Sequence, residues 1–140
     1  MTTVDLTREG EIATLMLNNP GKLNAINLGM WVQLAEIMAK LSVDRDIRCI
    51  VLRGAGSEAF AAGGDLEEFV TARATLDQAL HYHDQVATAL NAIADCPHPT
   101  VALIQGACIG GGLEIVGVCD LRICNESARF GAPINRLGFS

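Results

Sequence analysis

The sequence predicts an α/β fold, in which short strands and longer helices alternate along a single domain. Brief apolar runs rich in β-branched residues, bounded by glycine, proline or asparagine, are typical of buried strands. Between them lie segments whose apolar residues recur at helical spacing. A chain of 140 residues, 50% of them hydrophobic, is long enough to form its own core. Alternation of this kind favours stacked ββα or βαβ units.

The first elements are a hairpin and a helix. Residues 12–17 form an apolar run that follows a charged turn at 8–11 and ends at Asn18-Asn19-Pro20-Gly21, which is strong turn chemistry. Asn27 is suited to cap the helix that follows. The apolar positions of that helix predict one buried face, made of Met30, Leu34, Ile37, Met38 and Leu41.

The middle of the chain predicts a strand, a loop and a long helix. Residues 47–52 form a buried strand closed by Gly54, and residues 60–66 are a run of small residues that ends a loop and begins a helical segment. A helix is expected from about Thr75 to Asp95, before Pro97 and Pro99 stop it. The apolar residues of this helix recur at helical spacing and are expected to form one stripe that packs into the core. They are Leu76, Leu80, Val86, Leu90 and Ile93.

A strand at residues 100–104 leads into a glycine triplet, Gly110 to Gly112, and then into another helix. Glycines at a helix start leave the unpaired N–H groups open to a negatively charged oxygen. Glu114 lies about one turn further on, among apolar residues, so we expect it to be partly buried beside whatever the amides bind. The alternative is a tight structural turn with Glu114 ion-paired or exposed. Residues 121–124 predict a further strand.

Charge and composition exclude several classes of function. The formal net charge is −6 and no Lys/Arg run occurs, which argues against a nucleic-acid-binding surface. No apolar run is long enough to span a bilayer, and the first residues lack the pattern of a signal peptide. We therefore expect a soluble, cytoplasmic protein with no membrane partner.

The five cysteines are odd in number and lack C-x-x-C spacing, so they are interpreted as small core residues in a reducing compartment. His81, His83 and Asp84 could indicate a metal site, but no second cluster completes it. We therefore predict no metal and no separate cofactor.

Two helix starts are fronted by glycine, at Gly64 and at Gly111. If the fold brings them together, two peptide N–H groups can point at one oxygen, which is the geometry of an oxyanion hole. A dinucleotide site is the rival interpretation of a glycine-rich turn, but neither run has the G-x-G-x-x-G spacing.

Several motifs, in order, resemble the crotonase superfamily, the enoyl-CoA hydratase/isomerase family. Asn18 to Ile26 resembles its N-terminal loop, Phe60 to Leu66 its first oxyanion segment, Gly106 to Asp120 its second, and Phe130-Gly131-Ala132-Pro133 the segment that carries a further acid in hydratases. The resemblance implies a spiral of ββα units over residues 1–140, and an acyl-CoA thioester as ligand. CoA is then part of the substrate.

The resemblance also implies roles for individual residues. Gly64 and Gly111 would donate their N–H groups to the thioester carbonyl oxygen, and Glu114 would be the catalytic acid/base. The residues implied along the substrate path are Lys22, Leu23, Ala25, Ala62, Gly63, Asp65, Leu66 and Gly110, with Lys22 contacting a phosphate.

The chain departs from the family pattern in two ways. The second glutamate of hydratases belongs directly after Pro133, where this chain has Ile134, which cannot transfer a proton. Family members are also about twice this length, so the domain is expected to be truncated, without the C-terminal helical part that family members use to form trimers or hexamers. A homo-oligomer is nevertheless the expected assembly.

Three functions remain open. The first is an enoyl-CoA hydratase/isomerase family enzyme of acyl-CoA metabolism, with isomerase or hydrolase chemistry as the variant that Ile134 favours. The second is a catalytically silent subunit that binds acyl-CoA or a full-length partner. The third is a structural domain that binds no acyl-CoA at all.

Overall fold

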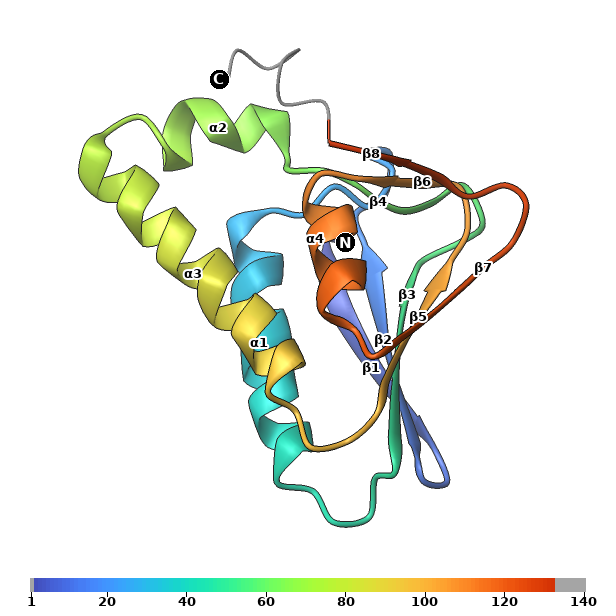
Figure 1. Cartoon of the computed structure of the whole chain (residues 1–140). Helices are drawn as coiled ribbons and strands as arrows, with labels where there is room; N and C mark the ends of the chain where they lie inside the picture. The colour runs from blue at the N-terminus through green and yellow to red at the C-terminus, as the bar shows by residue number, and fades with distance from the viewer. Residues whose placement is uncertain (1, 133–140) are drawn as a thin grey trace.

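The computed structural model describes residues 2–132, apart from the side chains of Leu66, Phe69 and Val70. Figure 1 shows two sheets with helices packed beside them. A five-stranded sheet has the order β1 (Thr3–Glu9), β2 (Ile12–Asn18), β3 (Cys49–Gly54), β5 (Thr100–Ile104) and β7 (Leu121–Cys124). A three-stranded sheet has the order β4 (Ala59–Ala62), β6 (Ala107–Ile109) and β8 (Arg129–Gly131). The described helices are α1 (Leu28–Ser42), α2 (Leu66–Ala72), α3 (Leu76–Ala94) and α4 (Gly111–Val118).

The chain repeats one unit: a strand of the large sheet, a strand of the small sheet, and then a helix. β3 continues into β4 before α2 and α3, β5 continues into β6 before α4, and β7 continues into β8. Neighbouring strands β2, β3, β5 and β7 pair in parallel, as do β4, β6 and β8. The repeat confirms the predicted spiral of ββα units.

Glycine makes the corners of this spiral possible. A Cβ atom at Gly54, where β3 ends, would lie 2.2 Å from the carbonyl oxygen of Ala59. A Cβ at Gly106, just after β5, would lie 1.9 Å from the carbonyl oxygen of Glu58, and Gly106 also has a φ of 65°. Only a residue without a side chain lets the backbones approach this closely.

The N-terminal hairpin and the first helix are confirmed. β1 and β2 are antiparallel, and the Asn27 side chain accepts a hydrogen bond from the Met30 amide at 2.8 Å, which caps α1. The buried face of α1 consists of Met30, Trp31, Leu34, Met38 and Leu41. The amphipathic pattern therefore predicted both the helix and the face that it buries.

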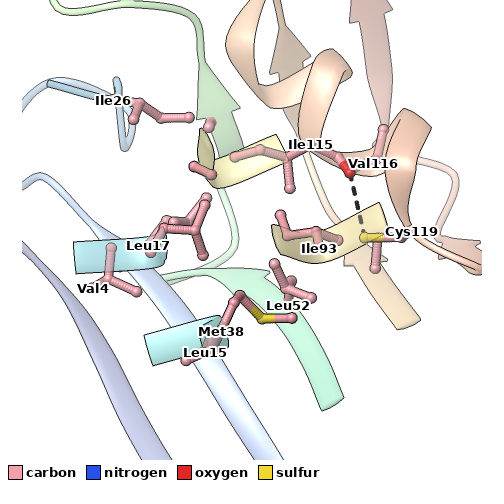
Figure 2. Packing of buried hydrophobic residues seen from close by; sticks show 14 of the residues in the cluster. Val4, Leu15, Leu17, Ile26, Met38, Leu52, Ile93, Ile115, Val116 and Cys119 are labelled. Atoms are coloured by element: carbon pink, nitrogen blue, oxygen red, sulfur yellow. Dashed lines mark hydrogen bonds between the residues drawn. The ribbon is translucent and has the colours of Figure 1, made fainter. Parts of the chain in front are cut away.

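The core lies between the large sheet and the helices. Figure 2 shows Leu15 and Leu52 of the sheet close to Met38 of α1, with Ile93 of α3 and Ile115 of α4 beside them. All five side chains are at most 1% exposed. Parallel strands need cover from helices on at least one face, and α1 and α3 provide it here.

Two expectations about elements were wrong. Strand β4 lies where the end of a loop was expected, and β6 and β8 were not predicted at all, because runs of three or four residues carry little pattern. The stripe predicted on α3 is buried only in part, since Leu76 is 74% exposed and Leu80 is 55% exposed. The start of α3 extends past α1 toward α2 in Figure 1.

The cysteines are also only partly as expected. Cys108 and Cys119 are buried, and burial raises the pKa of each thiol to about 11. Cys49 and Cys96 are half-buried, whereas Cys124 is exposed on β7. The described helices include none that is long and apolar enough to cross a membrane.

Two glycines of α4 should respond in opposite ways to alanine. A Cβ at Gly112 would lie 2.4 Å from the Ala61 carbonyl oxygen, so Gly112→Ala should lower the free energy of unfolding by about 1–3 kcal/mol. Nothing lies within 4 Å of a Cβ at Gly117, so Gly117→Ala should raise it by about 0.5–1 kcal/mol. Urea unfolding measures the free energy of unfolding of both variants. Equal changes in Gly112→Ala and Gly117→Ala would contradict the packing of α4 on β4.

Candidate active site

A pocket of about 190 Å³ lies where the helices meet the small sheet. Its walls come from the first turn of α1, the segment around Gly64, the α2–α3 region and the start of α4. The lining residues are Trp31, Gly64, Arg73, Tyr82, His83, Val86, Gly110, Gly111 and Glu114. Both predicted oxyanion glycines and the predicted acid/base therefore line one pocket.

The pairing of β4 with β6 explains why the two glycines converge. These strands are parallel and adjacent, with Ala62 opposite Ile109. If the register continues for two residues beyond the strands, Gly64 lies opposite Gly111, at roughly the 4.8 Å spacing of neighbouring strands. A Cβ at Gly110 would lie 3.4 Å from the Cα of Gly63, which supports this close approach.

The amides of Gly64 and Gly111 are available to a ligand. Within residues 2–132, neither N–H group donates a hydrogen bond to another residue. Gly111 is the first residue of α4, where an N–H group has no partner in the helix. Two unpaired donors that line the same pocket can bind a single oxygen atom that carries developing negative charge.

Glycine is also needed for the shape of this turn. Gly110 has a φ of 53°, a conformation that side chains rarely adopt. A Cβ at Gly111 would lie 3.1 Å from Cζ2 of Trp31, so any larger residue there would press on the indole. Gly110 is thus needed for its positive φ, and Gly111 for its close packing against Trp31 in the pocket wall.

Glu114 lies one turn into α4, and its amide donates to the Gly110 carbonyl oxygen at 3.0 Å. Its side chain lines the pocket, but the residue is exposed rather than partly buried as expected. The reason is the direction of α4, which turns Ile115 and Val116 into the core and leaves Glu114 on the pocket side. The carboxylate therefore faces both the pocket and solvent.

The loop before α1 holds the segment around Gly64 in place. The Ile26 amide donates to the Gly63 carbonyl at 2.8 Å, and the Asp65 amide donates to the Ile26 carbonyl at 3.2 Å. These two bonds flank Gly64 and leave its own N–H group unused. The loop therefore fixes the backbone while keeping the donor available.

Asn24 stabilises an unusual conformation of that loop. Leu23 and Asn24 both have positive φ, at 51° and 56°, which is uncommon for residues with side chains. The buried Asn24 amide group donates to the carbonyls of Ala55 and Ala59 at 3.0 Å each, and its oxygen accepts from the Asn19 amide. The side chain is fully hydrogen-bonded and offsets the strain of the turn.

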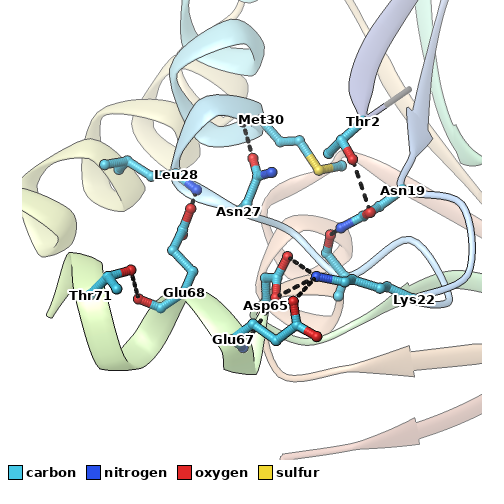
Figure 3. A network of polar contacts seen from close by, with 11 residues as sticks. Thr2, Asn19, Lys22, Asn27, Leu28, Met30, Asp65, Glu67, Glu68 and Thr71 are labelled. Carbon is cyan, nitrogen blue, oxygen red and sulfur yellow. Dashed lines mark hydrogen bonds and ion pairs between the residues drawn. The ribbon is translucent and has the colours of Figure 1, made fainter.

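Lys22 is engaged by two carboxylates, as Figure 3 shows. Its ammonium group lies 3.1 Å from Asp65 and 2.8 Å from Glu67. Hydrogen bonds to Glu67 first, and then to Asp65, raise the pKa of Lys22. Asp65 also caps α2 by accepting from the Glu67 amide, so Lys22 ties the loop to the start of that helix.

The remaining predicted substrate residues lie around the pocket rather than in its wall. Ala25 and Gly63 are buried, Ala62 is half-buried, and the Ala62 amide donates to the Leu23 carbonyl at 3.0 Å. Leu23 lines a separate hollow of about 510 Å³ between the loop and residues 55–59. The Leu66 side chain and Ile134 lie outside the described residues.

Five residues of the pocket wall were not predicted as site residues: Trp31, Arg73, Tyr82, His83 and Val86. The helical pattern explained Val86 as core, and Trp31 stands beside apolar positions of α1. Tyr82 and Val86 are one turn apart on α3, so they share a face. On this face only Tyr82 is aromatic with a polar group, and that character was the signal that the face borders a pocket.

Tyr82 is the most constrained of these residues. It is 5% exposed, and its hydroxyl makes no hydrogen bond to the described residues. Burial, and then the nearby negative charge of Glu68, raise the pKa of Tyr82 to about 12. Glu68 accepts from the Leu28 amide at 2.7 Å, and burial raises its own pKa (Figure 3). The phenol therefore stays protonated at neutral pH.

Among the described residues, no group of three His, Cys, Asp or Glu side chains is arranged to hold a metal ion. His83 faces the pocket, whereas His81 does not line it. The absence of a separate cofactor stays a prediction.

The comparisons with known proteins agree with this geometry. A family model described as enoyl-CoA hydratase/isomerase matches residues 7–140. A putative enoyl-CoA hydratase/isomerase of Bacillus subtilis is 36% identical over 87% of this chain and 46% of its own length. The mitochondrial Delta(3,5)-Delta(2,4)-dienoyl-CoA isomerase of Mus musculus is 36% identical over 83% of this chain and 38% of its own length.

A solved structure gives the same result. The crystal structure of an enoyl-CoA hydratase/carnithine racemase from Magnetospirillum magneticum has a TM-score of 0.95 and 47% identity, and the match covers all of this chain and 52% of that one. The chain thus spans about half the length of the proteins it matches, and over that half the fold is the same.

The single tyrosine of this chain allows its pKa to be measured directly. Phenolate absorbance should titrate near pH 12 in the folded chain and near pH 10 in urea. The folded state favours the protonated phenol of Tyr82, because its pKa is higher there than in the unfolded chain. The stability that this preference contributes is complete below pH 10 and is lost between about pH 10 and 12. A folded-state midpoint near 10 would contradict the burial of Tyr82.

Proposed function

Because the chain belongs to the enoyl-CoA hydratase/isomerase family, we propose that this pocket binds an acyl-CoA thioester and stabilises its enolate. The observation that carries the proposal is the pair of unpaired amides, Gly64 and Gly111, on neighbouring turns of the spiral. The thioester carbonyl oxygen would accept from both. In a site with little water, one such donor is worth about 3–4 kcal/mol of transition-state stabilisation.

Glu114 is proposed as the base. Its carboxylate would take a proton from a carbon beside the thioester carbonyl, and the electrons of the broken C–H bond would move to the carbonyl oxygen between the two amides. The position of Glu114 in the same pocket wall supports this role. Returning the proton to a different carbon would complete an isomerisation.

Isomerisation fits the sequence better than hydration does. Hydration would need a second group to deliver or accept a proton, and Ile134 stands where hydratases of the family carry that acid. Thioester hydrolysis, with Glu114 activating a water molecule, is the alternative. A catalytically silent acyl-CoA-binding subunit is the remaining candidate, and it differs in showing binding without turnover.

The assembly and the compartment are proposals too. Leu121 and Ile123 are neighbours on one face of β7, an edge strand, and are 57% and 59% exposed. Apolar side chains on an exposed edge support association of this chain with further copies. Five cysteines that form no disulfide are compatible with the cytoplasm, where thiols stay reduced.

Replacing Glu114 by Gln tests the base. Glu114→Gln removes the proton acceptor but keeps the shape, so turnover of a short enoyl-CoA should fall at least about 10²-fold. Binding should change less than about threefold. Trp31 is the only tryptophan and lines the pocket, so its fluorescence can measure binding of both forms.

Glu126→Gln is the matched control, since Glu126 is exposed in the turn between β7 and β8. Equal turnover in wild type and Glu114→Gln would exclude Glu114 from the mechanism. Saturable binding by a wild-type chain that turns over no substrate would favour the silent subunit. A folded chain that binds no acyl-CoA would refute the proposal.

Association can be tested with Ile123→Glu. A charge on the apolar edge should shift the chain toward the monomer in light scattering after size-exclusion chromatography. Val43→Glu, at an apolar residue 80% exposed after α1, is the control and should leave the assembly unchanged. A wild-type chain that is monomeric at high concentration would contradict the proposed association.

A further inference from the structure

The pocket that contains the proposed base also contains an imidazole. His83 of α3 and Glu114 of α4 line the same pocket, and both residues are exposed. Their exposure leaves both side chains open to solvent and to a ligand in the pocket. The proposed enolate chemistry uses Glu114 and the two amides, and it gives His83 no role.

The helical spacing of α3 explains why His83 lies at the pocket. Val86 follows His83 by three residues and Tyr82 by four, so the three side chains share one side of the helix, and all three line the pocket. α3 also packs against α4, which carries Glu114 in its first turn. His81 lies on another side of α3 and does not line the pocket. The packing of α3 on α4 therefore brings an imidazole and a carboxylate to one pocket.

The imidazole of His83 is free to react. Within residues 2–132, its side chain makes no hydrogen bond and no ion pair. Histidine and glutamate are the residue types that most often transfer protons in enzymes, and histidine both donates and accepts a proton near neutral pH. His83 and Glu114 can therefore form a pair of proton-transfer groups.

The size of the pocket suits a short acyl group that meets both side chains. Its volume is about 190 Å³, and an apolar cavity of about 150 Å³ holds a benzene molecule. The pocket is therefore on the scale of an acyl group a few carbons long. In such a group only one carbon separates the α-carbon, next to the thioester carbonyl, from the γ-carbon.

We infer that His83 is a second catalytic residue, which delivers a proton to the γ-carbon after Glu114 has removed one from the α-carbon. This assignment rests on the proposed function. It specifies the reaction as the movement of a double bond from the β,γ position to the α,β position of a short acyl chain. Ile134, at the position of the second glutamate of hydratases, is not needed for this reaction.

The proton and electron transfers balance. The electron pair of the broken C–H bond moves toward the thioester oxygen, which the two amides stabilise. When the carbonyl re-forms, a new double bond joins the α- and β-carbons, and the electron pair of the old double bond takes the imidazolium proton at the γ-carbon. Glu114 then releases its proton to solvent and His83 regains one from solvent, since both are exposed.

The test follows vinylacetyl-CoA in D₂O, because this substrate records proton removal and double-bond movement separately. Removal of the α-proton appears as deuterium in the recovered substrate, measured by mass spectrometry. Movement of the double bond appears as crotonyl-CoA, measured by its absorbance. His83→Gln should slow the formation of crotonyl-CoA about 10²-fold and should still incorporate deuterium, because Glu114 and the two amides remain. Glu114→Gln should lower both signals.

His81→Gln is the matched control. It makes the same substitution at an exposed residue of the same helix, two residues away from His83 and outside the pocket wall. Both the deuterium signal and the formation of crotonyl-CoA should stay at the level of the wild type.

Four outcomes would overturn the inference: unchanged formation of crotonyl-CoA in His83→Gln, an equal loss in His81→Gln, parallel loss of both signals in His83→Gln, or formation of hydroxybutyryl-CoA in place of crotonyl-CoA. The third would mean that His83 only supports the pocket, and the fourth that it acts on water. Deuterium incorporation by a wild-type chain that forms no crotonyl-CoA would also overturn the inference but leave the proposed enolate chemistry standing. A folded wild-type chain that gives neither signal would refute the proposed function itself.

Discussion

The parallel pairing of β4 with β6 is the constraint on which the candidate site depends. It sets the ends of two short strands side by side, so the glycine segments that follow them face the same space. Three further features support this arrangement. The loop before α1 forms hydrogen bonds to the residues on either side of Gly64. Gly112 lets α4 approach β4 closely, and the Asn24 side chain stabilises the loop through hydrogen bonds to backbone carbonyls.

Much of the fold could be predicted because its long elements carry clear patterns. The capped, amphipathic α1 and the apolar run of β5 were found at or near their observed bounds. The short strands of the small sheet were missed, since three or four small residues such as those of β6 are compatible with a turn. Their pairing is a tertiary effect that local sequence does not encode.

The residues of the candidate site also include some that the sequence predicted and some that it did not. Gly64, Gly111 and Glu114 were identified through glycine-fronted helix starts and a motif, and the structure brings them to one pocket. The opposite wall could not be predicted, because Tyr82 and Arg73 reach the pocket only through the packing of α3 and α2. The exposure of Glu114 was also misjudged, since apolar neighbours in sequence need not surround a residue on a short helix.

The spiral also has a consequence for how the chain folds. The two amides come from successive turns, separated along the chain by all of α2 and α3. Contacts between residues so distant in sequence form slowly, since the entropy of closing the intervening loop must be overcome first. A partly folded chain can therefore contain intact helices and still lack the pocket. A ligand that bridges the two amides binds only the fully wound chain, and so stabilises the native state by an amount that rises with the logarithm of its affinity.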